Sequence, residues 1–338
     1  MERKTDAKKT KSCEVLSSTG RKEMNILFSC DNNYAPYLAV TLSSILKSEF
    51  NSATNQRIRF FLLSAGVSED NKHYLKKLVE HYHCQLEIIE VDLGELADLP
   101  NTIGYISAAT YIRLKLADYL KVYSLKRLIY LDIDILVHQS LYPLWKTDLG
   151  GKSIGACYDN FIEPSKSDYK EKLGFSSSHY YFNTGVLLIG VEKWQTKNVF
   201  KRAMDWTTYC QDNHIEFLYQ DQDMLNHIFE NDVNYLDLRY NFNFNIFSRL
   251  RKKRQSKIPL KPEEKVTMPI AVSHFLGPKK AWHSQNQCAA LKASKFVELF
   301  EQLENRPKDW TINTKRSFLL KIKQKIKEIE YRYRYGIY

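Results

Sequence analysis

Hydrophobic positions along the chain alternate between two spacings, and this alternation predicts the fold class. Short apolar runs rich in β-branched and aromatic residues are typical of buried strands, and apolar residues that recur every three or four positions are typical of helices. The first strands are expected at 25–30, 57–63, 84–91 and 127–132. Helices are expected between them at 37–48, 68–82 and 108–120. This order favours an α/β fold with a mostly parallel sheet covered by helices.

Similar patterns continue through the second half of the chain. We expect further strands at 153–159, 182–190, 234–238 and 270–275, and helices at 191–210 and 221–230. Ser68 is the expected N-cap of the helix that follows it. The segment 246–269 is basic, contains proline and has no clear period, which predicts a surface loop.

Length and composition fit one large globular domain with appendages. The 338 residues are 43% hydrophobic, which excludes an intrinsically disordered chain. No run of 18 apolar residues occurs, so no membrane-spanning helix is expected. Residues 1–23 are polar and lack the apolar core of a secretory signal, which predicts a flexible leader. Six scattered cysteines without a C-x-x-C pair favour neither a zinc ribbon nor a disulfide framework, and they suit a reducing cytosol.

The net charge of +11 is concentrated near the C-terminus. From Arg306 to Tyr338, ten Lys and Arg stand against three Asp and Glu, an excess of seven positive charges. One helical stripe of apolar residues in this segment comprises Leu319, Ile322, Ile326, Ile329 and Tyr333. Basic amphipathic helices are typical of segments that lie on anionic membranes, so 311–338 is predicted to be a membrane-associating tail. The alternative is a helix docked on the domain with a solvated basic face.

Acidic residues stand where three predicted strands end. Asp31, Asp159 and the pair Asp132 and Asp134 each follow an apolar run, and ligands of parallel α/β sheets bind beyond such strand ends. Residues i and i+2 of a strand point to the same side, so Asp132 and Asp134 are expected to converge. A hard divalent cation, Mn²⁺ or Mg²⁺, would relieve their repulsion. The pair alone is weak support, since most D-x-D patterns are structural or incidental.

Other polar residues offer partners for such a cation and for a phosphate. His274 ends a predicted strand, although a lone histidine there is more often a satisfied core residue. Gly277 and Lys280 follow it in G-P-K-K, where glycine permits close backbone approach and lysine neutralises phosphate. Ordinary helix-start or turn-capping roles would equally explain three further candidates, namely Asp221, Gln222 and Asn183.

Six ordered segments carry a resemblance to a known family. They are DNNYAPYLAVTLSSI, SAATYIRLKLADYL, IYLDIDILVHQSLYPLW, YYFNTGVLLI, YQDQDMLN and VSHFLGPKKAWH. Their order and spacing resemble family 8 retaining glycosyltransferases, and most of all the branch of bacterial lipooligosaccharide α-1,4-galactosyltransferases, from about Met24 to Trp310. The resemblance implies a GT-A catalytic domain over 24–310, Rossmann-like with a mostly parallel mixed sheet flanked by helices. It also implies Mn²⁺ (or Mg²⁺) as cofactor and a UDP-hexose as donor.

The resemblance implies a role for each candidate residue. The metal ligands would be Asp132, Asp134 and His274. The residues that bind the nucleotide, the diphosphate and the donor sugar would be Asp31, Asn33, Tyr34, Arg113, Gly277 and Lys280, with Asp159 and Asp221 also on the sugar. Asn183 and Gln222 would line the reacting centre. Tyr34 would stack on the base, and Gly277 and Lys280 would hold the diphosphate.

The sequence leaves the mechanism and the acceptor open. Retention usually needs a carboxylate nucleophile, and Gln222, an amide, stands at the family's position for it. We therefore favour front-face attack, in which the leaving phosphate accepts the acceptor's proton, with Asp221 as a transient nucleophile as the alternative. Departures from the family at Gly104, Tyr105 and the basic segment 246–257 leave the acceptor and the linkage undetermined. Asn32, where the family usually has an acid, is a separate departure in a side chain that is not required for base contact.

The resemblance favours transfer of galactose to a terminal sugar of a lipopolysaccharide or lipooligosaccharide core, at the cytoplasmic face of the inner membrane. UDP-glucose in place of UDP-galactose is the alternative donor, since no single residue separates the two. A basic nucleic-acid-binding protein is the alternative class. Nucleic acid is not expected as a partner, because the charge gathers in a tail with an apolar stripe and no recognition motif is present.

Overall fold

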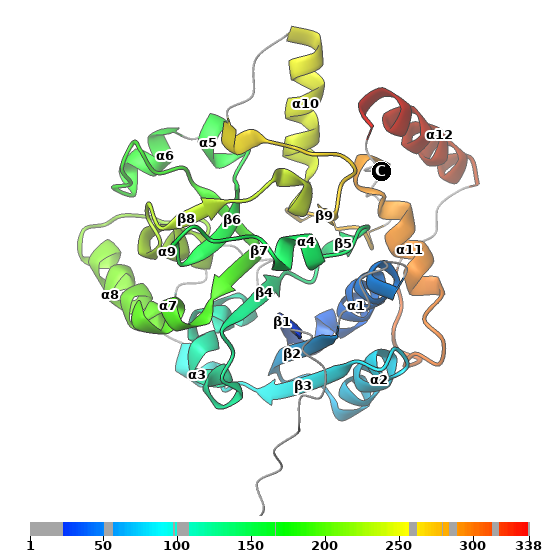
Figure 1. Ribbon diagram of the computed structural model, residues 1–338, viewed down its shortest axis with the longest axis horizontal. Coiled ribbons are helices and arrows are strands. Elements are labelled where there is room, and N and C mark those ends of the chain that lie inside the picture. The colour runs from blue at the N-terminus through cyan, green and yellow to red at the C-terminus, as the bar shows by residue number, and fades with distance from the viewer. Residues whose placement is uncertain are drawn as a thin grey trace, which may run out of the picture.

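A mostly parallel sheet forms the centre of the molecule (Figure 1). The computed structural model describes residues 23–50, 57–96, 99, 108–165, 167–256, 262–278, 280–283, 289–312 and 318–336. The strands of the central sheet, in chain order, are β1 Met24–Asp31, β2 Ile58–Ala65, β3 Gln85–Glu90, β4 Arg127–Leu131, β6 Ile154–Tyr158, β7 Phe182–Gly190 and β8 Val233–Tyr235. Their order in space is β3-β2-β1-β4-β7-β6-β8. Neighbours run parallel, except that β7 is antiparallel to both β4 and β6, so the predicted α/β sheet is confirmed.

Helices cover both faces of this sheet, because alternate side chains of a buried strand point to opposite sides. Along β1, Ile26 and Phe28 pack into the layer that contains α1 and α2, whereas Leu27 packs into the layer that contains α8 and α9. Ser68 accepts a hydrogen bond from the Asn71 N–H and caps α2, as predicted. The longer helices are α1 Ala35–Phe50, α2 Glu69–Glu80, α8 Val199–Asp212, α9 Asp221–Ile228, α10 Phe244–Ser256, α11 Ala293–Glu301 and α12 Phe318–Tyr335. The shorter ones are α3 Leu116–Leu120, α4 Tyr142–Trp145, α5 Ile162–Ser165, α6 Ser167–Lys172 and α7 Val191–Thr196.

The predicted loop at 246–269 is wrong over its first half, where α10 forms. The Asn243 side-chain oxygen accepts hydrogen bonds from the backbone N–H groups of Asn245 and Ile246 and caps the new helix. The Leu, Arg and Lys residues that follow are good helix formers, so the segment is helical even without a regular apolar period.

Other predicted boundaries also differ. The helix expected at 191–210 is two helices, because Asn198 adopts a left-handed conformation between α7 and α8. Most of the helix expected at 108–120 is a 3-10 helix, Ala108–Lys115, followed by α3. The strand expected at 234–238 ends with β8, because the Asp237 side chain caps a 3-10 turn.

A second, two-stranded sheet lies beside the first. It pairs β5 (Ile135–Val137) antiparallel with β9 (Val272–His274), and Ile135 lies opposite His274. The strand predicted at 270–275 therefore exists but belongs to this smaller sheet. The pairing of β9 with β5 brings His274 next to the chain that leaves β4.

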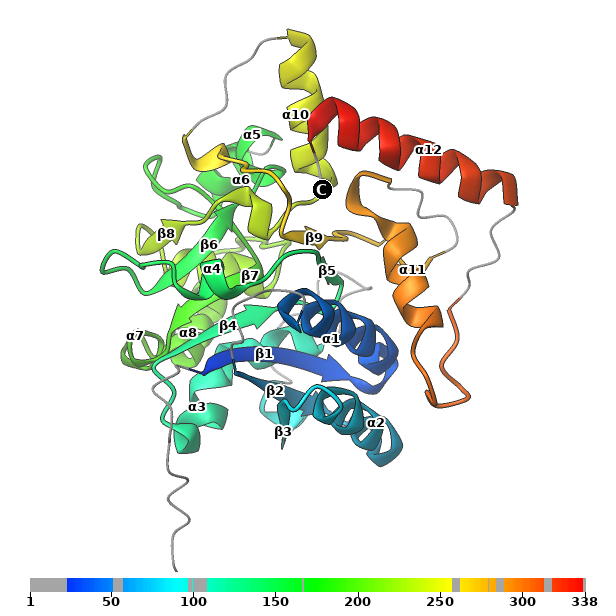
Figure 2. The ribbon, with the colours of Figure 1, turned by 45° about the vertical axis from the view of Figure 1, so that its right-hand side comes forward.

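The C-terminal helix α12 lies on the outside of the molecule, beside α10 and α11 (Figures 1 and 2). It is held by one of its faces: Gln324 is buried, Glu328 accepts a hydrogen bond from Ser294, and Tyr331 and Tyr335 pack on Phe247 of α10. Among the helices in the described part of the chain, none is both long and apolar enough to cross a membrane.

Candidate active site

The candidate residues meet at one edge of the central sheet. β1, β4 and β6 run in the same direction and end there, and the antiparallel β7 begins there. Asp31 is the last residue of β1, Asp132 follows β4, and Asp159 follows β6. Asn183 lies near the start of β7. Sequence segments more than 100 residues apart are therefore brought to one place by the direction of the strands.

A cleft of about 550 Å³ opens at this edge. It is lined by all the predicted site residues except Asn33, namely Asp31, Tyr34, Arg113, Asp132, Asp134, Asp159, Asn183, Asp221, Gln222, His274, Gly277 and Lys280. Asn33 is exposed, and it is its backbone N–H that contacts Asp31. The predicted contact of the Asn33 side chain with the nucleotide stays a prediction.

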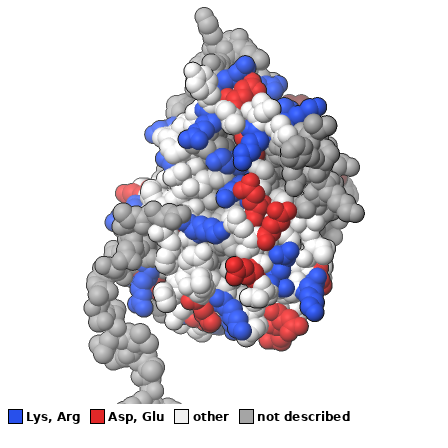
Figure 3. All heavy atoms as spheres, turned by 90° about the vertical axis from the view of Figure 1, so that its right-hand side faces the viewer, with Lys and Arg blue, Asp and Glu red and all other residues white. Residues whose placement is uncertain are grey.

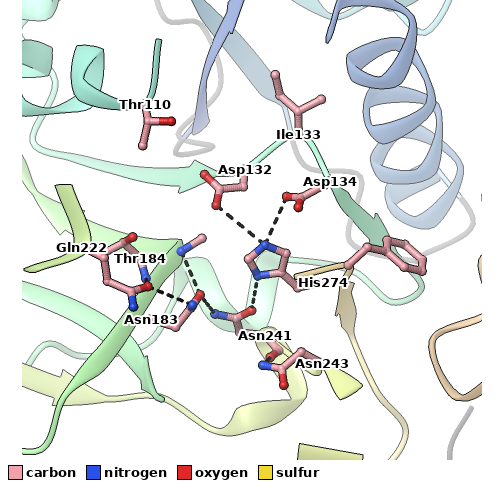
Figure 4. A network of polar contacts seen from close by, with 12 residues as sticks. Thr110, Asp132, Ile133, Asp134, Asn183, Thr184, Gln222, Asn241, Asn243 and His274 are labelled. Carbon is pink, nitrogen blue, oxygen red and sulfur yellow. Dashed lines mark hydrogen bonds and ion pairs between the residues drawn. The ribbon is translucent and has the colours of Figure 1, made fainter. Parts of the chain in front are cut away.

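Asp132, Asp134 and His274 converge on one point (Figure 4). His274 Nε2 lies 3.1 Å from Asp134 Oδ1 and 3.7 Å from Asp132 Oδ2. The predicted reason for the convergence is wrong, because β4 ends at Leu131 and the two aspartates lie in a bend. That bend is fixed by the Asp132 N–H, which donates to Gly185 O (2.8 Å), and by the Thr41 hydroxyl, which donates to Ile133 O (2.6 Å).

These three residues fit a divalent cation. One ligand atom from each lies within 4.8 Å of the others, and two carboxylates with one imidazole suit Mn²⁺ or Mg²⁺. Gly185 makes room for them: a Cβ at this position would lie 2.2 Å from His274 Cε1 and 2.8 Å from Asp132 Oδ2. Any larger residue would therefore displace the histidine or the carboxylate.

Positive charge surrounds the aspartates. The Lys280 ammonium donates to Asp134 Oδ2 and, at 3.2 Å, to Phe275 O. Burial alone would raise the pKa of Asp134, but Lys280 and His274 outweigh it and hold that pKa well below its usual value. Asp134 is therefore ionised at neutral pH although it is buried.

Arg113 connects the aspartate pair to Asp221. The buried guanidinium donates to Asp132 Oδ1 (2.8 Å) and to Thr184 O (2.9 Å), and its Nε lies 3.1 Å from Asp221 Oδ2. It also lies over the ring of Tyr130, with 4.3 Å between Cζ and the ring centroid. Burial raises the pKa of Asp221 to about 7, although Arg113 lowers it.

Amide side chains form the floor of the cleft. Asn183 Nδ2 donates to Gln222 Oε1 (3.0 Å), and Gln222 Nε2 lies 3.4 Å from Asp159 Oδ2. Asp159 Oδ1 also caps the turn that enters α5, where it accepts from the N–H groups of Phe161 and Ile162. Burial raises the pKa of Asp159, and these hydrogen bonds oppose the rise.

The end of the cleft near β1 has a rigid turn. Asp31 Oδ1 accepts hydrogen bonds from the N–H groups of Asn33 (2.9 Å) and Tyr34 (3.2 Å). Asn32 points elsewhere: its Oδ1 accepts from Ser68 N and Asn71 Nδ2 at the start of α2. The amide at this position therefore joins β1 to α2 rather than lining the cleft.

Several residues of the site were not found from the sequence. The cleft is also lined by Ser29, Cys30, Thr110, Tyr130, Ile133, Phe161, Ile162, Thr184, Tyr219, Asn245 and Leu276. Beneath them Asn241 joins His274 to Asn183. The run YNFNFN, with asparagines at every second position, was the available signal. Gly104 and Tyr105, the predicted departures on the acceptor side, lie outside the described residues.

Comparison with known proteins shows the family of this chain. The family model described as glycosyl transferase family 8 matches residues 25–286, which include the whole cleft. The chain belongs to glycosyltransferase family 8. Its structure superposes on that of the galactosyltransferase LgtC in complex with donor and acceptor sugar analogues with a TM-score of 0.76, at 37% sequence identity, over 85% of this chain and 99% of that one. The fold is accordingly GT-A, as the resemblance implied.

Two further relatives of this family 8 enzyme come from bacteria. A putative glycosyltransferase of Haemophilus influenzae is 34% identical over 91% of this chain and 88% of its own. The lipopolysaccharide glucosyltransferase WaaO of Escherichia coli is 26% identical over 77% of this chain and 73% of its own. Proteins named for galactose and for glucose transfer both resemble this chain, so family membership alone leaves the donor hexose open.

Proposed function

We propose that this enzyme is a retaining hexosyltransferase that moves galactose, with glucose as the alternative, from a UDP-sugar to a terminal sugar of a lipooligosaccharide or lipopolysaccharide core. The observation that carries the proposal is the Asp132, Asp134 and His274 cluster, which lies at the carboxyl edge of the sheet beside Lys280. Metal ligands next to a partly buried lysine suit a diphosphate, and the LgtC and WaaO similarities indicate the sugar and glycan classes.

The cation and its neighbours would act on the leaving group. Asp132, Asp134 and His274 would hold Mn²⁺ or Mg²⁺, which when bound supplies Lewis acidity toward the diphosphate. Lys280 would turn from Asp134 to the phosphate and oppose the charge that develops as UDP departs. At one end of the cleft, Asp31 and Tyr34 would bind the nucleoside of the donor. Gly277 would let the backbone approach the phosphates.

The residues on the other side of the cleft would hold the donor sugar. Arg113, Asp159 and Asp221 line this side, and Asn183 positions the Gln222 amide above it. Because an amide is a poor nucleophile, we propose front-face attack, with the leaving phosphate oxygen accepting the acceptor's proton. Asp221 is the carboxylate available for a covalent alternative, since it lies near the same centre.

The tail would place this enzyme on the inner face of the cytoplasmic membrane, where its glycolipid acceptor is built. On α12 the apolar stripe points outward: Ile322, Ile326, Ile329 and Tyr333 are 41%, 58%, 64% and 93% exposed. Lys323, Lys325 and Lys327 flank it and are exposed as well. Figure 3 shows this side of the molecule, with Lys and Arg spheres beside uncharged surface and interrupted by Asp and Glu. Anionic lipid headgroups suit such a face.

Hydrolysis of UDP-sugars, with and without Mn²⁺, tests the proposal across several donors. We expect UDP-galactose to be cleaved fastest, UDP-glucose more slowly, and both only when metal is present, with transfer products identified by mass spectrometry. Equal rates in EDTA would refute the metal site. Preference for a nucleotide other than UDP would refute the donor class. A pulldown with anionic liposomes and with RNA separates the membrane from the nucleic-acid alternative.

A further inference from the structure

We propose that Asn241 is a positioning residue, which sets the orientation of the metal-facing histidine and joins it to the reacting centre. This inference rests on the proposed function, because it assumes that His274 holds a cation. It follows from a chain of amides, seen in Figure 4, that runs from His274 through the buried Asn241 and Asn183 to Gln222. Each amide has a donor end and an acceptor end, so the orientation of one determines that of the next.

The chain is anchored by two backbone N–H groups, which can only donate. Gly185 N–H donates to Asn183 Oδ1 (3.0 Å), and Thr184 N–H donates to Gln222 Oε1 (3.2 Å). The Asn183 oxygen is therefore fixed toward Gly185, and its Nδ2 must point the other way, toward Gln222 Oε1 (3.0 Å). The orientation of both side chains follows from the backbone of β7 itself.

The same reasoning fixes Asn241. Its side chain lies 2.7 Å from Asn183 Oδ1, an oxygen that is already an acceptor, so the group there must be the Asn241 NH₂. The Asn241 oxygen then lies 2.8 Å from His274 Nδ1. Because an oxygen cannot donate, His274 Nδ1 must carry the hydrogen. Asn241 and His274 are each only 1% exposed, so water has little access to replace these bonds.

The consequence concerns the other ring nitrogen. With the hydrogen held on Nδ1, Nε2 is the ring nitrogen left to bind a cation, and Nε2 is the atom that lies 3.1 Å from Asp134 Oδ1. A lone pair beside two carboxylates is favourable when a cation lies between them. Asn241 thus prepares His274 as a ligand before the metal arrives, and a partner of this kind typically changes metal affinity 10–100-fold.

The other end of the chain would lie beside the donor sugar of the proposed reaction. Through Asn183, the orientation of Asn241 is tied to Gln222, whose Nε2 end points toward Asp159 Oδ2 at 3.4 Å. The metal ligand and the floor of the sugar site therefore share one hydrogen-bond chain. Changing the donor end of Asn241 should disturb Gln222, whereas changing its acceptor end should disturb His274.

Two substitutions separate these ends. Asn241→Leu removes both hydrogen bonds at similar volume. Asn241→Asp keeps an acceptor for His274 Nδ1–H but places an oxygen against Asn183 Oδ1. Titration of the purified full-length protein with Mn²⁺, in the presence of UDP and followed by electron paramagnetic resonance, measures metal affinity without any turnover. The rate of transfer at saturating Mn²⁺ is measured in parallel.

We expect Asn241→Leu to weaken Mn²⁺ binding about 10–100-fold. Asn241→Asp should bind Mn²⁺ at least as tightly as the native protein, yet show a kcat reduced about tenfold with little change in the donor KM. Asn243→Ser, in which a serine retains the cap of α10 two residues away, is the matched control and should leave Mn²⁺ affinity unchanged.

The outcomes separate this inference from the proposed function. If the native protein fails to bind Mn²⁺, the metal assignment itself is wrong. If the native protein binds and both Asn241 variants bind equally well and transfer at the native rate, the positioning role is wrong. Equal weakening in Leu and Asp variants would also overturn it, because only a general packing defect treats them alike. Should the Leu variant fail to fold, the Asp variant decides alone.

Discussion

Polar residues usually lie outside a protein and apolar residues inside. The floor of the cleft and the outer face of α12 both depart from this distribution, in opposite directions. In the floor, Asn183, Asn241 and His274 are polar and almost fully buried, and each has a hydrogen-bond partner. On α12, Ile326 and Ile329 are apolar and more than half exposed. A buried polar group is stable only when it is paired, and an exposed apolar stripe is useful only to a partner.

The two regions therefore differ in how they are held and in what they can contact. The floor is rigid, because its hydrogen bonds begin at backbone N–H groups of β7. The outer face of α12 is attached through its opposite side and leaves its stripe free for contact with another surface. Substitutions in the floor should change chemistry and not location, and substitutions on the stripe should do the reverse.

The largest expected effect comes from removing a carboxylate of the Asp132, Asp134 and His274 cluster. Asp134→Ala leaves Lys280 and His274 without their shared partner and removes one cation ligand, so transfer should fall roughly 10³-fold or more. Transfer assays over a range of Mn²⁺ concentrations measure this. Asp205→Ala, an exposed residue of α8 paired with Lys201, is the control and should retain native activity. Full activity in Asp134→Ala would contradict the metal site.

The next effect should appear at the membrane and leave the chemistry intact. Replacing Ile322, Ile326 and Ile329 together by Gln preserves helix propensity and removes the exposed apolar area, so binding to anionic vesicles should weaken roughly 100-fold. Transfer to a short soluble acceptor should stay native. Val122→Gln, which removes another exposed apolar side chain (74%), should leave vesicle binding unchanged. If the triple variant sediments with vesicles as the native protein does, the apolar stripe of α12 is not the surface that contacts the membrane.

This triple substitution is sharper than deletion of the tail. The buried side of α12 packs on Phe247, and Glu328 accepts from Ser294, so removing residues 315–338 would also expose the surface beneath. Deletion should still release the protein from membranes and spare transfer to a soluble acceptor. Loss of transfer on deletion, together with native transfer in the triple variant, would assign α12 a structural role besides its membrane contact.

The smallest effect concerns pH and lies just behind the floor. Asp223 accepts hydrogen bonds from the Tyr169 and Tyr181 hydroxyls (both 2.6 Å), and burial raises its pKa to about 6. A carboxyl whose pKa is higher in the folded state binds protons more tightly when folded, so the free energy of unfolding should fall as pH rises from about 4 through 6. Between pH 4.5 and 7.5 this loss is roughly 2 kcal/mol.

Urea unfolding of Asp223→Asn at several pH values measures that term. The variant lacks the titrating group, so the difference in unfolding free energy between native and variant proteins should shift with pH by about that amount. Asp205→Asn serves as the exposed control and should show no such shift. A constant difference between Asp223→Asn and the native protein across this range would contradict the linkage.

The fold and most of the candidate site could be predicted from the sequence. Strand and helix patterns are local, and each aspartate at a strand end could be identified from its neighbours in the chain. The prediction failed where one region depends on another. The sequence predicts a loop where α10 forms, because the capping role of Asn243 depends on a turn of the chain at that residue. The two aspartates converge through a bend held by Thr41 and Gly185 and not through the pleat of a strand.

Residue order and spacing are enough to predict the α/β alternation, the acids at the strand ends, the basic tail and the family. Only the folded molecule shows which groups share a hydrogen-bond chain and which side of α12 faces outward. Both depend on contacts between segments far apart in the chain, as between His274, Asn241 and Asn183. The orientation of a buried amide depends on which neighbouring group donates a hydrogen to it, and that arrangement exists only in the folded molecule.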